Sequence, residues 1–274
     1  MKNILVCLLI TLLLSCNHEP NFDLSILDVK RIDIETAQID NVDIYINQDR
    51  VVLIQNADLK NLVAKETVNA KGAFAIPGLW DNHIHFRGGE SLLKDNEMFL
   101  EQLIDYGITS VRDAGGDLAI SIKRWQLEIS KNERIGPTIF TSGPKIDGRN
   151  PTWQGSLEVE SEAELDQALD SLEQLEVDFI KIYDSKLNGR LFLSALKKSK
   201  TRGFKSSGHL PFSVTLNQAL DAGMNGVEHL YYILKGSSKD ELEITKQFQQ
   251  GALGFWQAMP LLINSYDDAT AQSL

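Results

Sequence analysis

Short apolar runs alternate with amphipathic stretches from residue 75 to residue 230, and this alternation limits the possible folds more than any other feature. The apolar runs predict strands at 75–86, 109–112, 138–141, 179–183, 204–207 and 226–230. The stretches between them predict helices at 97–106, 120–131, 162–175, 189–200 and 213–222. Strands that alternate with helices form right-handed crossovers and a parallel sheet, so the predicted fold class is α/β.

Six consecutive strand–helix units favour a (β/α)8 barrel of the TIM type over a doubly wound sheet, which the pattern alone leaves open. A full barrel takes ~250 residues, more than the stretch 76–274 offers. We therefore expect about six of the eight units and an incomplete barrel over 76–274. Residues 24–75 differ, because apolar and polar residues alternate with period two at 42–46 and around 50–54. They predict a separate small β unit.

The chain begins with a predicted secretory signal. A short, positively charged start precedes an apolar stretch over 4–14, which is shorter than the ~20 residues of a permanent membrane span. Leu13-Leu14-Ser15-Cys16 resembles a bacterial lipoprotein lipobox, in which cleavage precedes the cysteine and the thiol takes a lipid. We expect a lipoprotein signal peptide at 1–15, and lipidated Cys16 with a tether at 16–23. The alternative is an ordinary secretory signal with an incidental cysteine.

Composition narrows the expected location and partners. The leader signal predicts an exported bacterial protein that is anchored to a membrane by its N-terminal lipid only. Both cysteines, Cys7 and Cys16, lie in the leader, so the mature fold contains no internal disulfide. The formal net charge of -11 argues against a nucleic-acid partner, because phosphate binding requires clustered Lys and Arg.

Four of the five histidines fall at predicted strand ends. His83 and His85 are two apart on one strand, so their side chains point the same way. His209 follows the fifth predicted strand, and His229 lies at the end of the sixth. Because the carboxyl ends of barrel strands meet at one face, we expect the four imidazoles to gather there. Neutral imidazoles suit a divalent metal such as zinc, although a lone His-x-His pair also occurs by chance on surface strands.

Lys181 lies in the nearly apolar run 177–183, at the same predicted face. Burial among imidazoles that face a metal lowers the pKa of an ammonium and makes the amine nucleophilic. Reaction with carbon dioxide would then give a carbamate whose two oxygens can bridge two metals. The alternative is a lysine that extends to solvent from the strand end.

Six motifs at the predicted strands resemble the metal-dependent amidohydrolase superfamily, nearest to its imidazolonepropionase-like and Xaa-Pro dipeptidase branch. They lie at 76–85, 107–113, 136–143, 178–182, 207–211 and 227–229. The resemblance implies two divalent metal ions, usually zinc, with one on His83, His85 and Lys181 and the other on Lys181, His209 and His229. It also implies that 24–75 is the N-terminal part of a small β-sandwich.

The implied activity is hydrolysis of a carbon–nitrogen bond in a small-molecule amide, cyclic amide or dipeptide by metal-activated water. Family members carry a general-base aspartate at the end of the eighth strand, and no segment here matches that strand. Asp267 and Asp268 follow no apolar run and are interpreted as solvated turn residues. The catalytic residue is therefore unassigned. The alternative function is a truncated, catalytically inactive metal-binding lipoprotein fragment.

Aromatic residues close to the predicted ligand strands are candidates for substrate contact. Tyr183 and Tyr231 follow the strands of Lys181 and His229, and Trp153 lies on the loop after the third strand. Packing is the alternative role for each of them. Arg112 and Asp113, at the end of the second strand, are predicted to form a structural pair.

Overall fold

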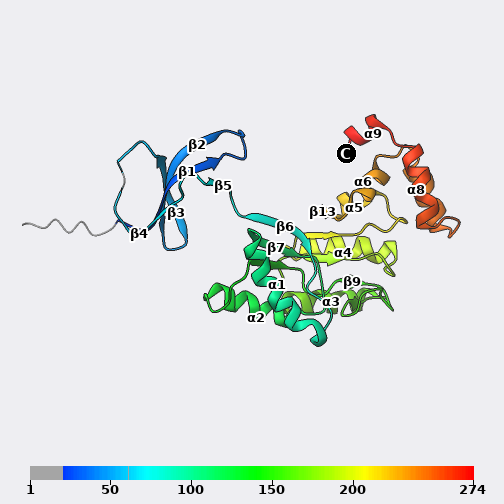
Figure 1. Ribbon diagram of the computed structural model, residues 1–274. Coiled ribbons are helices and arrows are strands. Elements are labelled where there is room, and N and C mark those ends of the chain that lie inside the picture. The colour runs from blue at the N-terminus through cyan, green and yellow to red at the C-terminus, as the bar shows by residue number, and fades with distance from the viewer. Residues whose placement is uncertain (1–20, 61) are drawn as a thin grey trace, which may run out of the picture. The chain divides into compact units, whose positions relative to one another are not determined.

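The computed structural model describes residues 21–60 and 62–274, which divide into two compact units between Pro77 and Gly78 (Figure 1). The predicted boundary was between residues 75 and 76. The predicted signal peptide and lipidated Cys16 lie outside the described residues. Within the described ranges, no helix has both the length and the apolar character that a bilayer crossing requires.

The first unit is one five-stranded sheet. Its strands are β1 (Phe22–Ile32), β2 (Ile39–Asn47), β3 (Arg50–Asn56), β4 (Ala64–Asn69) and β5 (Phe74–Ala75). The order is β3-β2-β1-β4, and β5 also pairs with β1. The pairings of β2 are antiparallel, whereas β4 and β5 run parallel to β1. The small β unit is present, and the described residues form a single sheet; that this sheet is part of a sandwich stays a prediction.

Strand β1 is long, although charged residues interrupt its apolar pattern. The strand continues because Asp28 forms a bulge with φ of 57°, and the register with β2 shifts between Ile26 and Val29. The Asp28 backbone N–H donates to a carboxylate oxygen of Asp43 at 3.0 Å. A charged residue that breaks the alternation is thus accommodated by an extra residue in one strand.

The sheet of the first unit buries few side chains. Val29, Val42 and Tyr45 are buried, and the Tyr45 ring packs against another aromatic ring at 4.8 Å. Val51 and Val68 remain 57% and 51% exposed. A single sheet that leaves apolar residues exposed on this scale has a small core of its own.

The second unit contains two parallel sheets with helices beside them (Figure 1). The first sheet has the order β6 (Leu79–Ile84), β7 (Ile108–Asp113) and β8 (Thr138–Thr141). The second has the order β10 (Leu157–Glu158), β9 (Ile146–Asp147), β11 (Ile180–Ile182), β12 (Ser206–Gly208) and β13 (Gly226–Val227). The predicted α/β alternation is confirmed, but the described strands do not close into a barrel.

The two sheets adjoin at Asp178, which precedes β11. Its backbone N–H donates to the carbonyl of Thr141 at the end of β8, at 2.8 Å. Its carboxylate accepts from the backbone N–H of the same Thr141, also at 2.8 Å. Strands β8 and β9 belong to different sheets because the chain turns between them, with Gly143 at φ of 60°. The two-residue strands β9 and β10 were not predicted, because so short a segment carries no periodic pattern.

The helices confirm the predicted positions to within a few residues. They are α1 (Leu93–Asp105), α2 (Ala119–Ser130), α3 (Glu162–Gln174), α4 (Gly189–Thr201) and α5 (Leu216–Ala222), with a short 3-10 helix η1 (Glu90–Leu92) before α1. Further along lie α6 (Leu230–Gly236), α7 (Glu241–Gln249), α8 (Phe255–Asn264) and α9 (Asp268–Gln272). Ser161 and Thr215 begin α3 and α5 with capping boxes, which satisfy otherwise unpaired backbone N–H groups.

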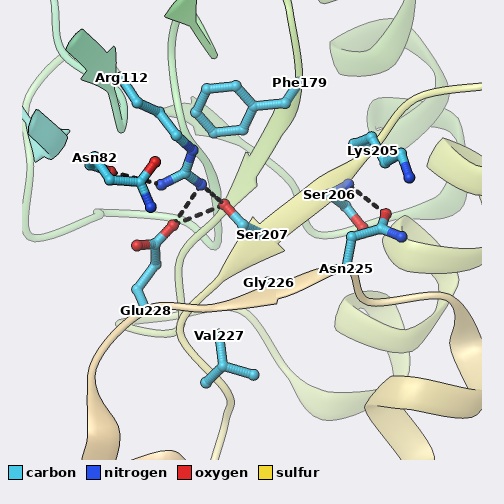
Figure 2. A pocket seen from close by; sticks show the side chains of 10 residues that line it. All are labelled: Asn82, Arg112, Phe179, Lys205, Ser206, Ser207, Asn225, Gly226, Val227 and Glu228. Carbon is cyan, nitrogen blue, oxygen red and sulfur yellow. Dashed lines mark hydrogen bonds and ion pairs between the residues drawn. The ribbon is translucent and has the colours of Figure 1, made fainter. Parts of the chain in front are cut away.

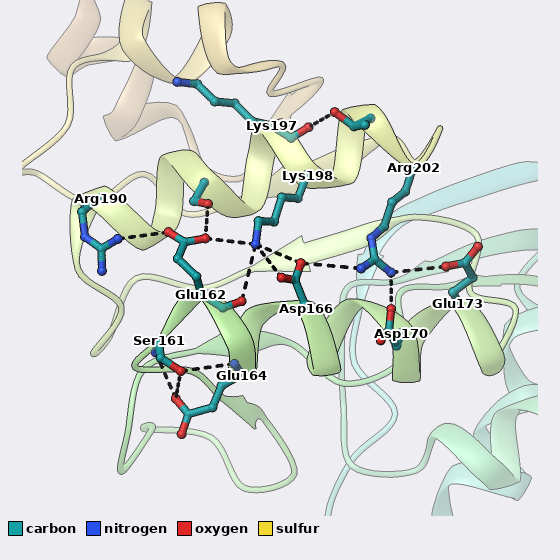
Figure 3. A network of polar contacts seen from close by, with 12 residues as sticks. Ser161, Glu162, Glu164, Asp166, Asp170, Glu173, Arg190, Lys197, Lys198 and Arg202 are labelled. Carbon is teal, nitrogen blue, oxygen red and sulfur yellow. Dashed lines mark hydrogen bonds and ion pairs between the residues drawn. The ribbon is translucent and has the colours of Figure 1, made fainter.

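Helices α3 and α4 are joined by ion pairs on the surface (Figure 3). Lys198 lies 2.9 Å from Asp166 and 3.0 Å from Glu162, and Arg202 lies 2.6 Å from Asp170. Beneath them is the larger core of the unit, in which Leu169, Leu196 and other apolar side chains of these helices pack with β11. This core supports the carboxyl ends of β11, β12 and β13.

Candidate functional site

The four predicted imidazoles form one continuous row at the carboxyl ends of the strands. His83 is in β6 and His85 follows it, whereas His209 and His229 follow β12 and β13. The ring centroids of His83 lie 5.0 Å from His85 and 5.2 Å from His229, and those of His209 and His229 are 4.8 Å apart. Both sheets of the second unit therefore contribute to one site.

The hydrogen bonds of His83 and His85 fix their tautomers. The Nδ1 of His83 lies 2.8 Å from a carboxylate oxygen of Glu228, and the Nδ1 of His85 lies 2.7 Å from the carbonyl of Gly115. Both partners are acceptors, so each Nδ1 carries the hydrogen and each Nε2 keeps its lone pair. Imidazoles that bind metals have this arrangement.

The two Nε2 atoms of His83 and His85 are 3.2 Å apart. In these tautomers both lone pairs face each other, and neither Nε2 carries a hydrogen that it could donate to the other. Two nitrogens on one tetrahedral zinc ion, each at about 2.0–2.1 Å from it, lie about 3.3 Å apart. Burial lowers the pKa of His85 to about 4, although its hydrogen bond to Gly115 acts in the opposite direction. The pair is thus preorganised for a cation.

His209 is oriented by Asp184, whose carboxylate lies 3.3 Å from the imidazole Nδ1. The hydroxyl of the buried Tyr232 donates to the same carboxylate at 3.1 Å. Burial lowers the pKa of His209, and the nearby Asp184 only partly offsets this effect. Gly208 allows this approach, because a Cβ on it would lie 2.1 Å from the carbonyl oxygen of Ile182 on the neighbouring strand.

His229 differs from the other three histidines in its backbone. Its φ of 72° with ψ of 136° lies outside the regions that side chains with a Cβ ordinarily adopt. Such conformations cost about 1–3 kcal/mol and cluster at functional sites. The Tyr231 ring stacks on the His229 ring at 5.5 Å, and the Tyr183 ring lies 4.2 Å from that of His209. Both predicted tyrosines therefore pack against predicted ligands.

Lys181 is fully buried in β11, and its amine makes no hydrogen bond with any residue in the described ranges. The amine lies 3.4 Å from Glu228. Burial lowers the pKa of Lys181 to about 8, even though the charge of Glu228 raises it. Its side chain does not extend to solvent, so the alternative prediction of a solvent-exposed lysine at the strand end is excluded. A buried amine without a hydrogen-bond partner is suited to a modification that supplies polar partners.

Glu228 is the centre of the polar contacts at the site, and the sequence analysis did not single it out. Arg112 donates to it at 2.7 Å and the Ser207 hydroxyl donates at 2.7 Å (Figure 2). Burial raises the pKa of Glu228, but the hydrogen bonds from His83 and Arg112 and the charge of Lys181 hold it well below its usual range. Glu228 is therefore a carboxylate that orients His83.

The predicted pair of Arg112 and Asp113 is wrong. Neighbouring residues on a strand point to opposite faces, so the two side chains diverge. Arg112 lies over the Phe179 ring at 4.2 Å and lines a cavity of about 260 Å³ with Ser207 and Glu228 (Figure 2). Asp113 points into the protein, where it accepts from the Thr141 hydroxyl at 2.7 Å, and burial raises its pKa to about 6.

Trp153 lies away from the imidazole row and lines a different cavity, of about 330 Å³. The guanidinium of Arg87 lies over its ring at 4.7 Å. Two of the three aromatic candidates, Tyr183 and Tyr231, therefore lie at the imidazoles, and Trp153 lies in a neighbouring cavity.

Asp267, which was interpreted as a turn residue, accepts from the Thr270 backbone N–H at 2.7 Å and begins α9.

Across residues 21–60 and 62–274, no three His, Cys, Asp or Glu side chains converge on one point as metal ligands. His83 and His85 supply two nitrogens, and zinc sites ordinarily have three or four protein ligands. A further ligand of another kind is needed, and the Lys181 amine, which makes no hydrogen bond within the described residues, lies in the same site. The chemistry of these donors fits a divalent metal once that amine is converted to an oxygen donor.

Two of the residues that orient the imidazoles, Glu228 and Asp184, could have been predicted from the sequence. Glu228 directly precedes His229, and Asp184 is an acidic residue just beyond the strand of Lys181. Carboxylates next to strand ends are frequent partners of ligating histidines. The carbonyl of Gly115 gives no such signal, because every residue carries a backbone carbonyl.

Comparison with known proteins supports the predicted resemblance. No family model matches the chain. An adenine deaminase of Thermosipho africanus (strain TCF52B) is 35% identical over 89 residues, which are 32% of this chain and 14% of the relative. An adenine deaminase of Desulforamulus reducens (strain ATCC BAA-1160 / DSM 100696 / MI-1) is 25% identical over 192 residues, which are 68% of this chain and 31% of the relative. The chain therefore matches about a third or less of the length of these curated relatives.

Among solved structures, a Xaa-Pro dipeptidase with bound methionine in the active site is similar to this chain with a TM-score of 0.65. It is 17% identical, and the match covers 91% of this chain and 72% of that one. At this identity the likeness establishes the fold. Together with the sequence relatives, it confirms the resemblance to the amidohydrolase superfamily.

Proposed function

We propose that this chain, which resembles the amidohydrolase superfamily in sequence and in fold, hydrolyses a carbon–nitrogen bond in a small-molecule amide, cyclic amide or dipeptide. One observation carries the proposal: a row of four imidazoles, three of them with an acceptor at Nδ1, lies beside Lys181, a buried amine that has no hydrogen-bond partner among the described residues. Such an arrangement has little structural use, because a buried amine without a hydrogen bond destabilises a fold.

The residues of the site suit two divalent metal ions, for which the family resemblance implies zinc. His83 and His85 with Lys181 would hold one ion, and His209 and His229 with Lys181 the other. When bound, the ions polarise the scissile carbonyl and lower the pKa of water toward ~7. Glu228 and Asp184 keep the Nδ1 atoms protonated, so that each Nε2 faces the site.

Lys181 would serve both ions as a carbamate. Its lowered pKa leaves part of the amine neutral near pH 7, with a nitrogen lone pair available. The lone pair forms a bond to the carbon of carbon dioxide, one C=O bond becomes a C–O⁻ group, and the nitrogen releases a proton. The product carries two oxygens where the amine had none, and these oxygens can accept hydrogen bonds or bind metal.

We further propose that the two parallel sheets of the second unit belong to a TIM-type barrel and that the first unit is part of a small β-sandwich. The strands β6 to β13 place their functional residues at the carboxyl ends, which is the face that carries the active sites of barrel enzymes. The exposed valines of the first unit are the kind of surface that a second sheet would cover.

Two other functions remain as alternatives, each with an observation in its favour. The similarity to adenine deaminases favours deamination of an aminopurine, since deamination also breaks a carbon–nitrogen bond. The second alternative, a metal-binding lipoprotein without catalysis, is favoured by the imidazoles at the strand ends, because such a row can hold metal without any proton transfer. Assays of the purified protein for dipeptide cleavage, cyclic amide opening and ammonia release from adenine separate the three.

Metal analysis of a Lys181→Ala variant tests the proposed centre. Zinc content should fall from two ions per chain to one or none, because both ions would lose a shared ligand. Lys186→Ala is the matched control, since Lys186 is exposed and lies five residues further along the chain. Unchanged zinc content in Lys181→Ala, or no zinc uptake by the wild type in the presence of bicarbonate, would contradict the proposal.

We also propose that the protein is exported and is lipid-anchored through Cys16. The lipobox-like sequence before this cysteine supports the proposal. Metabolic labelling with a radioactive fatty acid should mark the wild type, and Cys16→Ala should remain unlabelled. Equal labelling of the two proteins would refute the assignment.

A further inference from the structure

The loop after β11 carries two side chains that lie against His209. The Tyr183 ring is 4.2 Å from the His209 ring, and the Asp184 carboxylate is 3.3 Å from the His209 Nδ1. Loops are ordinarily more mobile than the elements they connect, so a loop that orients a candidate metal ligand has to be held in place. The contacts that hold this loop come from β9, the neighbouring strand in the sheet.

Asp147, in β9, is the centre of these contacts. Its side chain is fully buried, and its Oδ1 accepts the backbone N–H of Lys186 at 2.9 Å and that of Leu187 at 3.1 Å. The same oxygen accepts the backbone N–H of Gly148 at 2.7 Å. The Ser185 hydroxyl donates to the other oxygen, Oδ2. One carboxylate therefore binds three consecutive residues of the loop.

The backbone on both sides of Asp147 also fits the loop closely. The Tyr183 backbone N–H donates to the carbonyl of Ile146 at 2.9 Å, which continues the pairing of β9 and β11 into the loop. A Cβ on Gly148 would lie 2.3 Å from the carbonyl group of Lys186, so a larger residue would displace the loop backbone. The loop is thus in contact with β9 along its whole first half.

The Asp147 carboxylate is buried at a cost in free energy, because it leaves water. It forms no ion pair with any residue in the described part of the chain, so its hydrogen bonds alone offset the loss of hydration. Hydrogen bonds to an ionised carboxylate are about twice as strong as neutral ones, and two oxygens with several donors fix one geometry. Such a contact holds a loop in a single position, which the orientation of a metal ligand requires.

We propose that Asp147 is a positioning residue that sets the orientation of His209, and with it the second of the two candidate metal sites. The inference rests on the proposed function and deepens it. Asp147 binds the loop at residues 185–187, and the loop places the Asp184 carboxylate at the His209 Nδ1. With the hydrogen on Nδ1, the lone pair remains on Nε2, where a metal ion can bind it.

His83 provides an internal comparison, because a different part of the fold orients it. Its Nδ1 lies 2.8 Å from Glu228, which follows β13. Within the described ranges, the hydrogen bonds of the Glu228 side chain involve no residue of the loop after β11. Loss of Asp147 should therefore change His209 and leave His83 as it is. A merely structural role of Asp147 would affect both imidazoles.

Proton–nitrogen NMR correlation spectra of the metal-free protein report the tautomer of each imidazole without metal or substrate. In the wild type, we expect the Nδ1–H form for both His209 and His83. In Asp147→Ala, His209 should become a mixture of the two tautomers, because the Asp184 carboxylate is no longer held at its Nδ1. Asp147→Asn should restore most of the wild-type signal, since an amide oxygen can still accept the N–H groups of the loop.

Zinc titration measures the consequence for metal binding. Asp147→Ala should weaken one of the two zinc ions by about 10- to 100-fold, the range for loss of a group that orients a ligand, and leave the other unchanged. Ser185→Ala removes one contact of the carboxylate and should weaken the same ion by less than about 10-fold. Asp170→Ala is the matched control, because it removes an exposed aspartate between α3 and α4 and should change neither ion.

The NMR spectra and the titration separate failure of the positioning role from failure of the proposed function. An unchanged His209 tautomer in Asp147→Ala, or equal changes in His209 and His83, would overturn the inference. If Asp147→Ala does not fold by circular dichroism, Ser185→Ala replaces it, and a wild-type His209 tautomer in that variant would overturn the inference. A change confined to His209, in a protein that takes up no zinc, would support the positioning role and refute the proposed metal centre.

Discussion

Two polar networks of the second unit contain similar charges in opposite surroundings. One joins Glu228 to Arg112, His83 and Lys181 at the strand ends, and the other joins α3 to α4 on the surface (Figure 3). The side chains of Lys181 and Glu228 are 1% and 8% exposed. Those of Arg202 and Asp170 in the surface network are 23% and 57% exposed.

The difference in burial decides what each network does. Water solvates the charges between α3 and α4, so each pair there contributes little to stability and its loss is tolerated. At the strand ends, each buried charge depends on its partners, and removal of one leaves the others without compensation. A fold retains such a costly arrangement where its groups must be held in fixed positions, as metal ligands must be.

The largest expected effect is that of Glu228→Ala. It leaves the Arg112 guanidinium and the Lys181 amine buried without their carboxylate, which should lower the free energy of unfolding by about 3–5 kcal/mol. Urea unfolding of the metal-free protein measures the change. Glu173→Ala is the control, because Glu173 belongs to the surface network. If the two variants lost equal stability, burial would not distinguish the networks.

A smaller effect is expected from acid, through His85. The pKa of this imidazole falls from 6.5 to about 4 on folding, so the unfolded chain binds the proton more tightly. Its contribution to stability is complete above pH 6.5 and is lost progressively as the pH falls toward 4. The melting temperature of the metal-free wild type should therefore fall more between pH 7 and pH 4.5 than that of His85→Gln. Parallel curves for the two proteins would show that burial of His85 does not penalise its protonation.

The smallest effect is that of Arg202→Ala in the surface network. Its loss should change the free energy of unfolding by less than about 1 kcal/mol, because its partners are exposed. Added salt should reduce the difference from the wild type, since salt screens exposed pairs more than buried ones. A loss as large as that of Glu228→Ala, measured in the same urea series, would remove the contrast between the two networks.

Most elements of the second unit could be predicted because their signals are local. Helix α3, for example, begins at a capping box and follows an apolar period, both of which lie within one segment of sequence. The sequence failed to predict features that depend on residues far apart in the chain. Strand β9 is two residues long and is defined by its pairing with β10 and β11, and Arg112 reaches a partner 116 residues away.

The sequence by itself determined the alternation of strands and helices and the position of four histidines and of Lys181 relative to a strand end. These follow from periodicity and from the geometry of a single strand, which depend on neighbouring residues. The tertiary structure decided which acceptor meets which imidazole, and that Lys181 is buried without a hydrogen-bond partner. The contact of His83 with Glu228 spans 145 residues, and only the packing of two sheets brings such groups together.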